Sequence, residues 1–217
     1  MNAEAPGLAL ALRQGTADLH RRAEQAGIVR AILAGQVQRH GYALYLRNLL
    51  PAYQALERGL DSHRAAPGLA PLALPQLYRA GAIMRDLDVL TGAGWADELP
   101  LLPAGAAYAA AVDAAAAGDG AGLAGHAYTR YLGDLSGGRI MARLLAAVPG
   151  IGPAAMQFHR FPEIPDIGAF KDAYRAGLDR LGRRLADPGR VVAAARAAFA
   201  HNIELAEAVG AAASAAD

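Results

Sequence analysis

The sequence predicts an all-α fold, and three observations support this prediction. Hydrophobic residues make up 54% of the 217 residues, much of that share is alanine, and only 6% of residues are aromatic. Alanine is the strongest helix former and a small core residue, whereas β-sandwiches use more β-branched and aromatic residues. Apolar residues recur every three or four positions over long segments, as they do in amphipathic helices. Strand-like alternation does not persist anywhere in the sequence.

The composition also excludes several functional classes. The net charge is +1, which argues against nucleic acid as the main partner. The sequence has no cysteine, which excludes disulfides, iron–sulfur clusters, thiolate metal ligands and cysteine nucleophiles. Residues 1–12 lack the pattern of a signal peptide, and no stretch reaches the roughly 18 apolar residues of a membrane span. We therefore expect a soluble cytoplasmic protein without a membrane anchor.

Glycine and proline divide the chain into seven or eight expected helices. We expect one domain over residues 1–217, with flexible ends at about 1–7 and 212–217. The expected helices cover residues 8–26, 28–33, 38–62, 76–90, 103–117, 123–148, 167–186 and 188–213. The third has a broad apolar face formed by Tyr42, Tyr45, Leu46, Leu49, Tyr53 and Leu56, and Pro51 is expected to kink it.

A histidine in the first expected helix is a candidate metal ligand. His20 has Thr16 and Glu24 one turn away on either side and Arg13 two turns earlier. A carboxylate one turn from a histidine can accept the second imidazole N–H and so fix the tautomer and the direction of the ring. The alternative is that His20 and Glu24 are an ordinary pair on a solvated helix face, a common arrangement.

The other histidines give no metal-site pattern. Their positions, His40, His63, His126, His159 and His201, show no spacing that suggests a shared site, and His63 and His159 are expected in loops. The sequence also lacks the Glu-x-x-His motif of ferritin-like di-iron bundles.

A glycine-rich helical segment is the most specific feature of the sequence. Residues 126–141 read HAYTRYLGDLSGGRIM, and each glycine inside a helix costs about 0.5–1 kcal/mol relative to alanine. Gly133 and Gly137 share a face, so a flat ligand could lie against the backbone there. Gly137 and Gly138 together permit a kink.

Two charged residues accompany the glycines. Asp134 lies beside the bare face and Arg130 one turn before it, so the carboxylate is well placed to order water near a ligand. The alternative is a close helix–helix crossing of the small-xxx-small type. That alternative explains Gly133 and Gly137 but does not require Gly138 or the neighbouring charges.

The segment from Tyr128 to Gly138 closely resembles the signature of the heme oxygenase family. The resemblance extends from about Leu12 to Leu205. Other matching segments are LRQGTADLHRRAE at 12–24, GQV at 35–37, GY at 41–42, FKDAYR at 170–175 and FAHNI at 199–203. The resemblance implies a single-domain, multi-helical heme oxygenase-like fold, with heme between a proximal helix and a kinked distal helix.

The same resemblance implies a role for each matching residue. His20 would be the proximal iron ligand, supported by Glu24. Asp134 would organise distal water, assisted by Arg130 and Tyr53. The glycines Gly133, Gly137 and Gly138 would pass close over the heme. The remaining heme-binding positions are Arg13, Tyr128, Lys171 and Arg175 at the propionates, Phe199 and Asn202 on the far wall, and Thr129.

The implied activity is oxidative cleavage of heme at a meso carbon to biliverdin, carbon monoxide and ferrous iron. Heme b would be both substrate and cofactor, with molecular oxygen as co-substrate. A ferredoxin or a flavin reductase would supply electrons, and a basic rim around Arg13 and Lys171 is a candidate docking face. We expect a monomer.

Three other functions fit the sequence less well. A heme storage or transfer protein on the same scaffold would keep His20 but would not need Asp134, Arg130 and the full glycine set. A thiamine-degrading hydrolase of related fold would need a cysteine nucleophile. A purely structural helical module would not explain the glycine-rich segment.

Overall fold

The computed structural model describes residues 7–66 and 68–215, and these residues contain no strand. The helices are α1 (Leu8–Gly15), α2 (Ala17–Glu24), α3 (Gly27–Leu33), α4 (Arg39–Ser62), α5 (Ala80–Thr91), α6 (Trp95–Glu98), α7 (Pro103–Ala115), α8 (Ala121–Ala127), α9 (Gly133–Ala146), α10 (Ile167–Gly182) and α11 (Gly189–Ser214). Short 3₁₀ turns lie at Pro75–Leu77 and Pro153–Ala155. The all-α prediction is confirmed.

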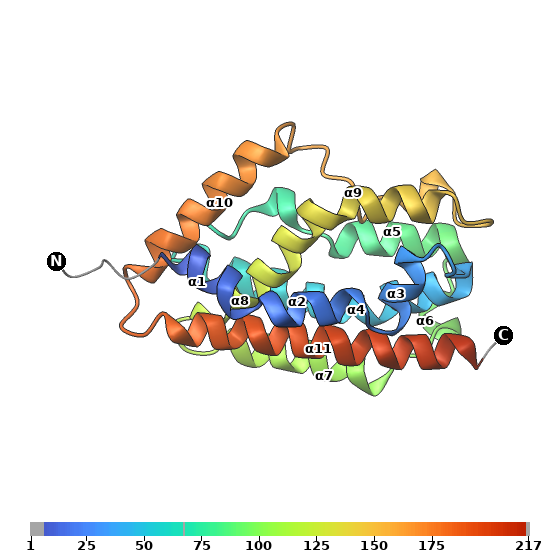
Figure 1. Cartoon of the computed structure of the whole chain (residues 1–217), viewed down its shortest axis with the longest axis horizontal. Coiled ribbons are helices and arrows are strands. Elements are labelled where there is room, and N and C mark those ends of the chain that lie inside the picture. Colours follow the sequence, from blue (N-terminus) through green and yellow to red (C-terminus); the bar gives the residue numbers. More distant parts are fainter. Residues whose placement is uncertain (1–6, 67, 216–217) are drawn as a thin grey trace.

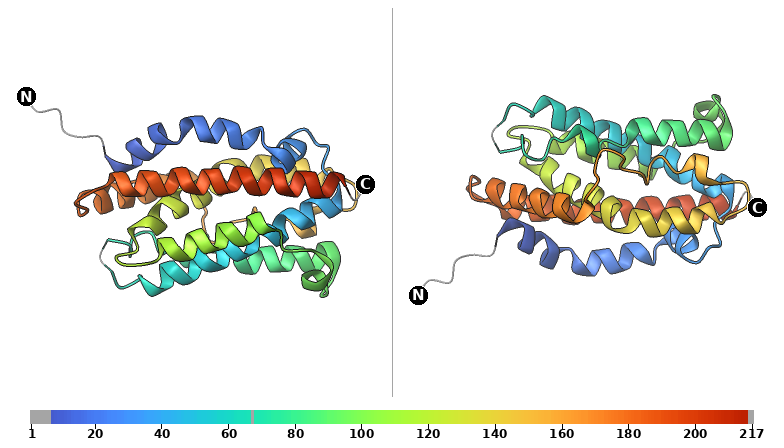
Figure 2. Two further views of the ribbon diagram at one scale, coloured as in Figure 1. Left: turned by 90° about the horizontal axis from the view of Figure 1, so that it is seen from below. Right: turned by 90° about the horizontal axis from the view of Figure 1, so that it is seen from above.

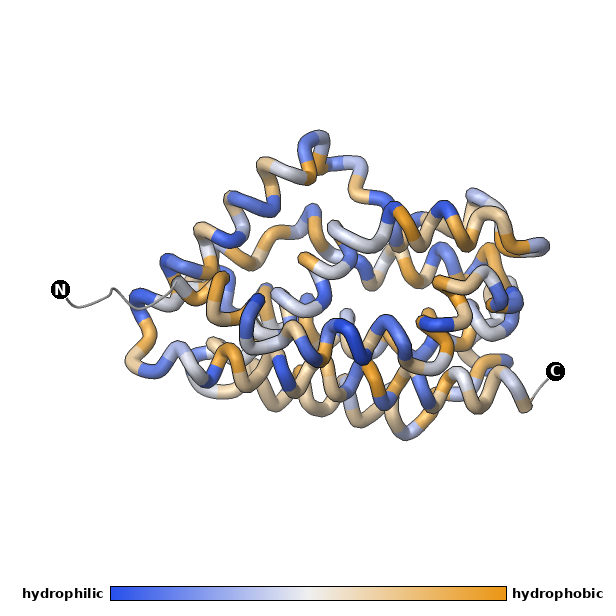
Figure 3. Tube along the Cα trace, in the orientation of Figure 1, coloured by the Kyte–Doolittle hydropathy of each residue, from blue (hydrophilic) through white to orange (hydrophobic). Residues whose placement is uncertain are grey.

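The long helix α11 runs along the length of the molecule at its lower edge in Figure 1, and α1–α4, α7 and α8 pack against it. Figure 2 shows α1, α2 and α3 on one side of α11, and α4 and α7 on the other. Hydrophilic residues gather along α2, whereas α11 is mostly apolar (Figure 3). Within the residues described, none of the helices combines the length and the apolar character that a membrane span requires.

The core is centred on α4 and contains several buried tyrosines. The predicted apolar face of α4 is confirmed, because Tyr42, Leu46, Leu49 and Tyr53 are fully buried. Most other α4 residues are buried as well, as expected for a helix with neighbours on nearly all sides. Pro51 lies inside α4.

Several helix boundaries differ from the prediction. The first expected helix is divided at Thr16, whose φ of −118° and ψ of 1° interrupt the helix between α1 and α2. The Thr16 hydroxyl donates a hydrogen bond to Leu12 O at 2.8 Å, which satisfies this carbonyl at the break. The expected helix 76–90 begins only at Ala80, and α10 ends at Gly182 rather than near residue 186. At the C-terminus, α11 continues to Ser214, so residues 212–214 are helical.

The expected helix 123–148 forms a continuous helical run with one irregular turn. Between α8 and α9, residues Tyr128–Leu132 adopt π-helical geometry. Single π-helical turns inside α-helices often lie at functional sites, and they bend the helix. Figure 1 shows that the chain also changes direction part-way along α9. A kinked helix therefore carries the glycine-rich segment.

Two glycines outside that segment allow helices to approach α11 closely. A Cβ on Gly125 of α8 would lie 2.5 Å from Val191 O and 2.6 Å from Ala195 N. A Cβ on Gly27, whose φ is +31°, would lie 2.1 Å from Ala206 O. Because backbone atoms cannot move aside easily, both crossings require glycine. Gly27 therefore does more than end the helix predicted before it, because it also starts α3 in close contact with α11.

The α8–α11 crossing can be tested with Gly125→Ala. We expect the free energy of unfolding to fall by about 1–3 kcal/mol, because the new methyl group overlaps the α11 backbone. Urea denaturation would measure the change. Gly81→Ala is the control, since its Cβ would meet only the flexible Arg85 side chain at 3.5 Å. Equal stability of Gly125→Ala and the wild type would contradict this description of the crossing.

Candidate active site

A groove lies between α2, the kinked α8–α9 run and α11. It has two hollows, of about 220 Å³ and 850 Å³, which share the wall residues His20, Thr129, Gly133 and Phe199. The larger hollow falls in the range of roughly 300–1,000 Å³ typical of small-molecule sites. Because the shared residues come from all three of these segments, the two hollows form one continuous groove.

The glycine face of α9 borders this groove without touching other parts of the protein. A Cβ built on Gly133 or on Gly137 would meet no atom outside its own helix within 4 Å. A close helix–helix crossing would place backbone or side-chain atoms there, as at Gly125. The packing alternative is therefore wrong for these two glycines, and their bare backbone forms the wall of the groove. Gly138 differs, because its Cβ would contact His159 at 3.5 Å.

His20 faces this wall from α2. Its side chain is 57% exposed, and it borders both hollows. Nδ1 of His20 lies 3.6 Å from Oε1 of Glu24, and the His20 ring is 5.9 Å from the Phe199 ring, centroid to centroid. Glu24 is thus close enough to orient the imidazole through Nδ1, which leaves Nε2 available as a metal ligand. Within the described residues, no cluster of three or more His, Asp or Glu side chains could hold a bare metal ion.

A buried hydrogen-bond network supports Asp134 behind the glycine face. The Tyr53 hydroxyl donates to Oδ2 of Asp134 at 2.6 Å, and Arg130 donates from Nε to the Tyr53 oxygen at 2.9 Å. A second guanidinium nitrogen of Arg130 lies 3.5 Å from Oδ1 of Asp134, and a third donates to Oδ1 of Asn202. Asn202 in turn points its amide nitrogen toward the Tyr108 hydroxyl at 3.5 Å. Residues from four helical segments therefore fix one carboxyl group at the groove.

Burial and neighbouring groups shift the pKa values of this network. Burial raises the pKa of Asp134, while the charge of Arg130 and the hydrogen bond from Tyr53 act in the opposite direction. Burial also raises the pKa of Tyr53 well above its ordinary value, and that of Tyr108 to about 12. Both tyrosines therefore keep their hydroxyl protons near neutral pH. A buried carboxyl group with a raised pKa, held by fixed hydrogen-bond donors beside a groove, is a candidate for general acid–base work.

Basic and polar side chains surround the larger hollow. Arg13, Tyr128 and Arg175 line it together with Ser136. Lys171 does not line the hollow directly, but its Nζ donates to the Ser136 hydroxyl at 3.3 Å. The four predicted propionate-binding residues are thus at one end of the groove, where they can bind a carboxylate ligand.

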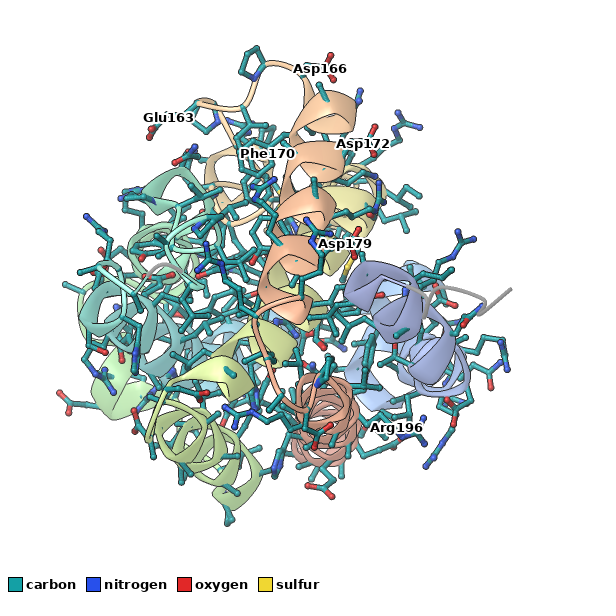
Figure 4. The ribbon with its side chains drawn as sticks, turned by 90° about the vertical axis from the view of Figure 1, so that its left-hand side faces the viewer. Glu163, Asp166, Phe170, Asp172, Asp179 and Arg196 are labelled. Atoms are coloured by element: carbon teal, nitrogen blue, oxygen red, sulfur yellow. The ribbon has the colours of Figure 1, made fainter. Side chains whose placement is uncertain are left out.

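Two side chains anchor α1 and α2 to the rest of the molecule (Figure 4). Asp179 of α10 accepts a hydrogen bond from the Ala9 backbone N–H at 2.8 Å, near the N-terminus of α1. Arg196 of α11 donates to the Gly15 carbonyl and, at 3.2 Å, to Asp18. These contacts lie on either side of the Thr16 break and hold the helix that carries His20.

Several wall residues were not predicted. The smaller hollow is also lined by Tyr45, Phe158 and His159, and Tyr108 extends the network behind Asn202. His159 lies in a loop, as predicted, yet it is only 6% exposed. The one local signal of this burial in the sequence is the aromatic residues at 158–161, which are unusual in a solvated loop.

Comparison with known proteins identifies the family. The heme oxygenase family model matches residues 6–208. The chain belongs to the heme oxygenase family. Heme oxygenase 1 of Nostoc sp. is 35% identical over 199 residues, covering 91% of this chain and 84% of that protein. Human heme oxygenase 1 is 34% identical over 204 residues, covering 92% and 70%.

Solved structures support the same conclusion. Heme oxygenase-1 of the cyanobacterium Synechocystis in complex with heme superposes with a TM-score of 0.88 at 32% identity, covering 97% of this chain and 96% of that one. Heme oxygenase of Leptospira interrogans superposes with a TM-score of 0.85 at 29% identity, covering 94% and 100%. The predicted heme oxygenase-like fold is confirmed.

The groove has the features that heme requires. It has an open backbone wall for a flat ring, one exposed histidine opposite for the iron, and basic groups at one end for the propionates. His20 would hold the iron, and Gly133 and Gly137 would face the ring.

Gly137→Ala tests whether the bare glycine face exists for a ligand. In the heme-free protein we expect the free energy of unfolding to rise by about 0.5–1 kcal/mol, because alanine favours the helix and meets no neighbour. Hemin binding should weaken roughly tenfold, since the methyl group overlaps the ring. Urea denaturation and a hemin titration would measure the two effects. Loss of stability with unchanged hemin affinity would mean that Gly137 serves packing after all.

Proposed function

We infer that this protein opens the heme ring oxidatively, with His20 as the iron ligand and Asp134 as the group that orders distal water. The products are biliverdin, carbon monoxide and ferrous iron. The observation that carries this proposal is the bare face of Gly133 and Gly137, which lies across the groove from His20 and beside a buried, hydrogen-bonded carboxyl group. Bound heme supplies both the iron at which dioxygen is reduced and the ring that is cleaved.

On the proximal side, His20 supplies a neutral imidazole. Such a ligand would donate less electron density to a bound iron than a thiolate does. Glu24, whose Oε1 lies 3.6 Å from Nδ1 of His20, would orient the ring so that Nε2 is free to hold the iron.

On the distal side, the glycines and Asp134 have separate tasks. Gly133 and Gly137 exclude side chains from the space above the ring, so small molecules are held close to a meso carbon. Asp134 holds water at that point and passes a proton through it. Tyr53 and Arg130 fix the Asp134 carboxyl group so that it does not reorient when the ligand arrives. Thr129, Phe199 and Asn202 complete the pocket wall.

At the other end, Arg13, Tyr128, Lys171 and Arg175 bind the propionates and so set the rotation of the ring. Arg175 also pairs with Asp172 at 2.7 Å, which holds its guanidinium beside the larger hollow. These residues would thereby select which meso carbon of a bound heme is cleaved.

The external partners are part of the same proposal. Electrons come from a ferredoxin or a flavin reductase that docks on the basic rim around Arg13 and Lys171, to which the exposed Arg21 also contributes. We propose that residues 1–217 form one domain, which a family match over residues 6–208 supports, and that the protein acts as a monomer. A cytoplasmic location, where such donors are kept reduced, completes the proposal.

Asp134→Ala tests the proton-relay role. We expect hemin affinity within about twofold of the wild type, whereas ring opening should fall by on the order of 100-fold or more, the usual contribution of a positioned acid. A hemin titration measures binding, and the biliverdin absorption during turnover with ascorbate or a ferredoxin–reductase system measures ring opening.

Asp113→Ala is the matched control for this experiment. It removes a surface carboxylate on α7 that pairs with Arg58 far from the groove, so turnover should be unchanged. A normal biliverdin yield from Asp134→Ala would remove Asp134 from the mechanism.

A further inference from the structure

His159 is a second polar residue in the distal wall, and it makes no hydrogen bond to the residues of the Asp134 network described above. It lines the smaller hollow together with His20 and Asp134. Its Nδ1 is the atom nearest to a Cβ built on Gly138, at 3.5 Å. Asp134 and Gly138 are four residues apart on α9, so they share a face and are separated by roughly 6 Å along the helix.

The loop that carries His159 is held firmly on both sides. Asp86 of α5, which is fully buried, accepts hydrogen bonds from the backbone N–H groups of Gln157 and Phe158, each at 2.8 Å. Arg79, also buried, donates to the Arg160 carbonyl. Backbone atoms on either side of His159 are therefore fixed by buried charged groups, and the ring position is set before any ligand binds.

The contact with Tyr42 determines which ring nitrogen of His159 carries the proton. The Tyr42 hydroxyl is fully buried and lies 3.2 Å from Nε2 of His159, and it has no other hydrogen-bond partner within the described residues. If Tyr42 accepted this hydrogen bond, its own proton would be buried without an acceptor, at a cost of about 1–3 kcal/mol. Tyr42 therefore donates to Nε2, and Nδ1 carries the histidine proton.

The charge state of His159 agrees with this assignment. Burial, together with the charge of Arg130, lowers the pKa of His159 to about 4. The ring is therefore neutral near pH 7. Burial raises the pKa of Tyr42 well above its ordinary value, so the donor keeps its proton. Within the described residues, the Nδ1–H has no protein acceptor.

We propose that His159 donates a hydrogen bond from Nδ1 into the distal cavity and holds a water molecule over Gly138, one helical turn from Asp134. This proposal rests on the proposed function, because it adds a second anchor to the same distal site. Two fixed groups separated by roughly one turn can be bridged by one or two waters. His159 is thus a positioning residue that sets where the water ordered by Asp134 lies.

The first experiment uses the heme-free protein. Long-range ¹H–¹⁵N NMR of the His159 ring should show the proton on Nδ1, and Tyr42→Phe should remove that preference. A proton on Nε2 in the wild type would overturn the proposal. This measurement does not depend on heme binding or turnover.

The second experiment measures azide binding to the ferric heme complex, with azide as a probe of distal hydrogen bonding. His159→Phe keeps the ring shape and should weaken azide binding about fivefold, the loss expected for one neutral hydrogen bond. His159→Asn places an amide near the position of Nδ1 and should restore most of the affinity. His159→Gln places its amide near Nε2 and should behave like His159→Phe.

Two outcomes of the azide experiment would overturn the role of His159. One is equal azide affinity in the wild type and His159→Phe, and the other is equal weakening in His159→Asn and His159→Phe, which would indicate a packing effect. Failure of the wild type to bind hemin would instead contradict the proposed function, and the NMR experiment would still decide the orientation of His159.

Discussion

The bare backbone of α9 at Gly133 and Gly137 is the constraint on which the rest of the site depends. A ligand as broad as heme can approach a helix closely only where side chains are missing, and here two glycines on one face provide that space. The helix loses stability at each glycine. Packing elsewhere must compensate, and the close crossings of α8 and α3 with α11 are examples of such packing.

A glycine surface binds a flat ligand but has no chemistry of its own, so the polar groups must come from behind and beside it. Arg130 and Asp134 lie on either side of Gly133, and Tyr53 reaches them from the buried face of α4. The charge of Arg130 offsets part of the cost of burying Asp134. The carboxyl group is therefore held rigidly, and burial keeps its pKa above that of an ordinary aspartate.

The proximal side is organised differently, because His20 is on a short, exposed helix. Its position depends on contacts from α10 and α11, where Asp179 and Arg196 hold the two sides of the Thr16 break. The groove therefore has a distal wall, α9, that is part of the core, and a proximal wall, α2, that these contacts attach to the core.

Much of this could be predicted from local sequence patterns. Helical spacing predicted α4 and its buried face, and the glycine-rich segment predicted an unusual helix surface with Asp134 and Arg130 beside it. The sequence could not separate a ligand face from a packing face, because that distinction depends on what lies opposite Gly133 in space. It also missed the burial of His159, since the residues that hold its loop and contact its ring, Asp86 and Tyr42, are more than 70 positions away.

The central claim is that one imidazole, that of His20, holds the iron opposite the glycine wall. Resonance Raman and absorption spectra of the ferrous heme complex would test it most directly, in the wild type and in His20→Ala. We predict an iron–histidine stretching band in the wild type, its loss in His20→Ala, and its replacement by an iron–imidazole band when free imidazole is added. An unchanged spectrum in His20→Ala would show that another residue ligates the iron and would contradict this account.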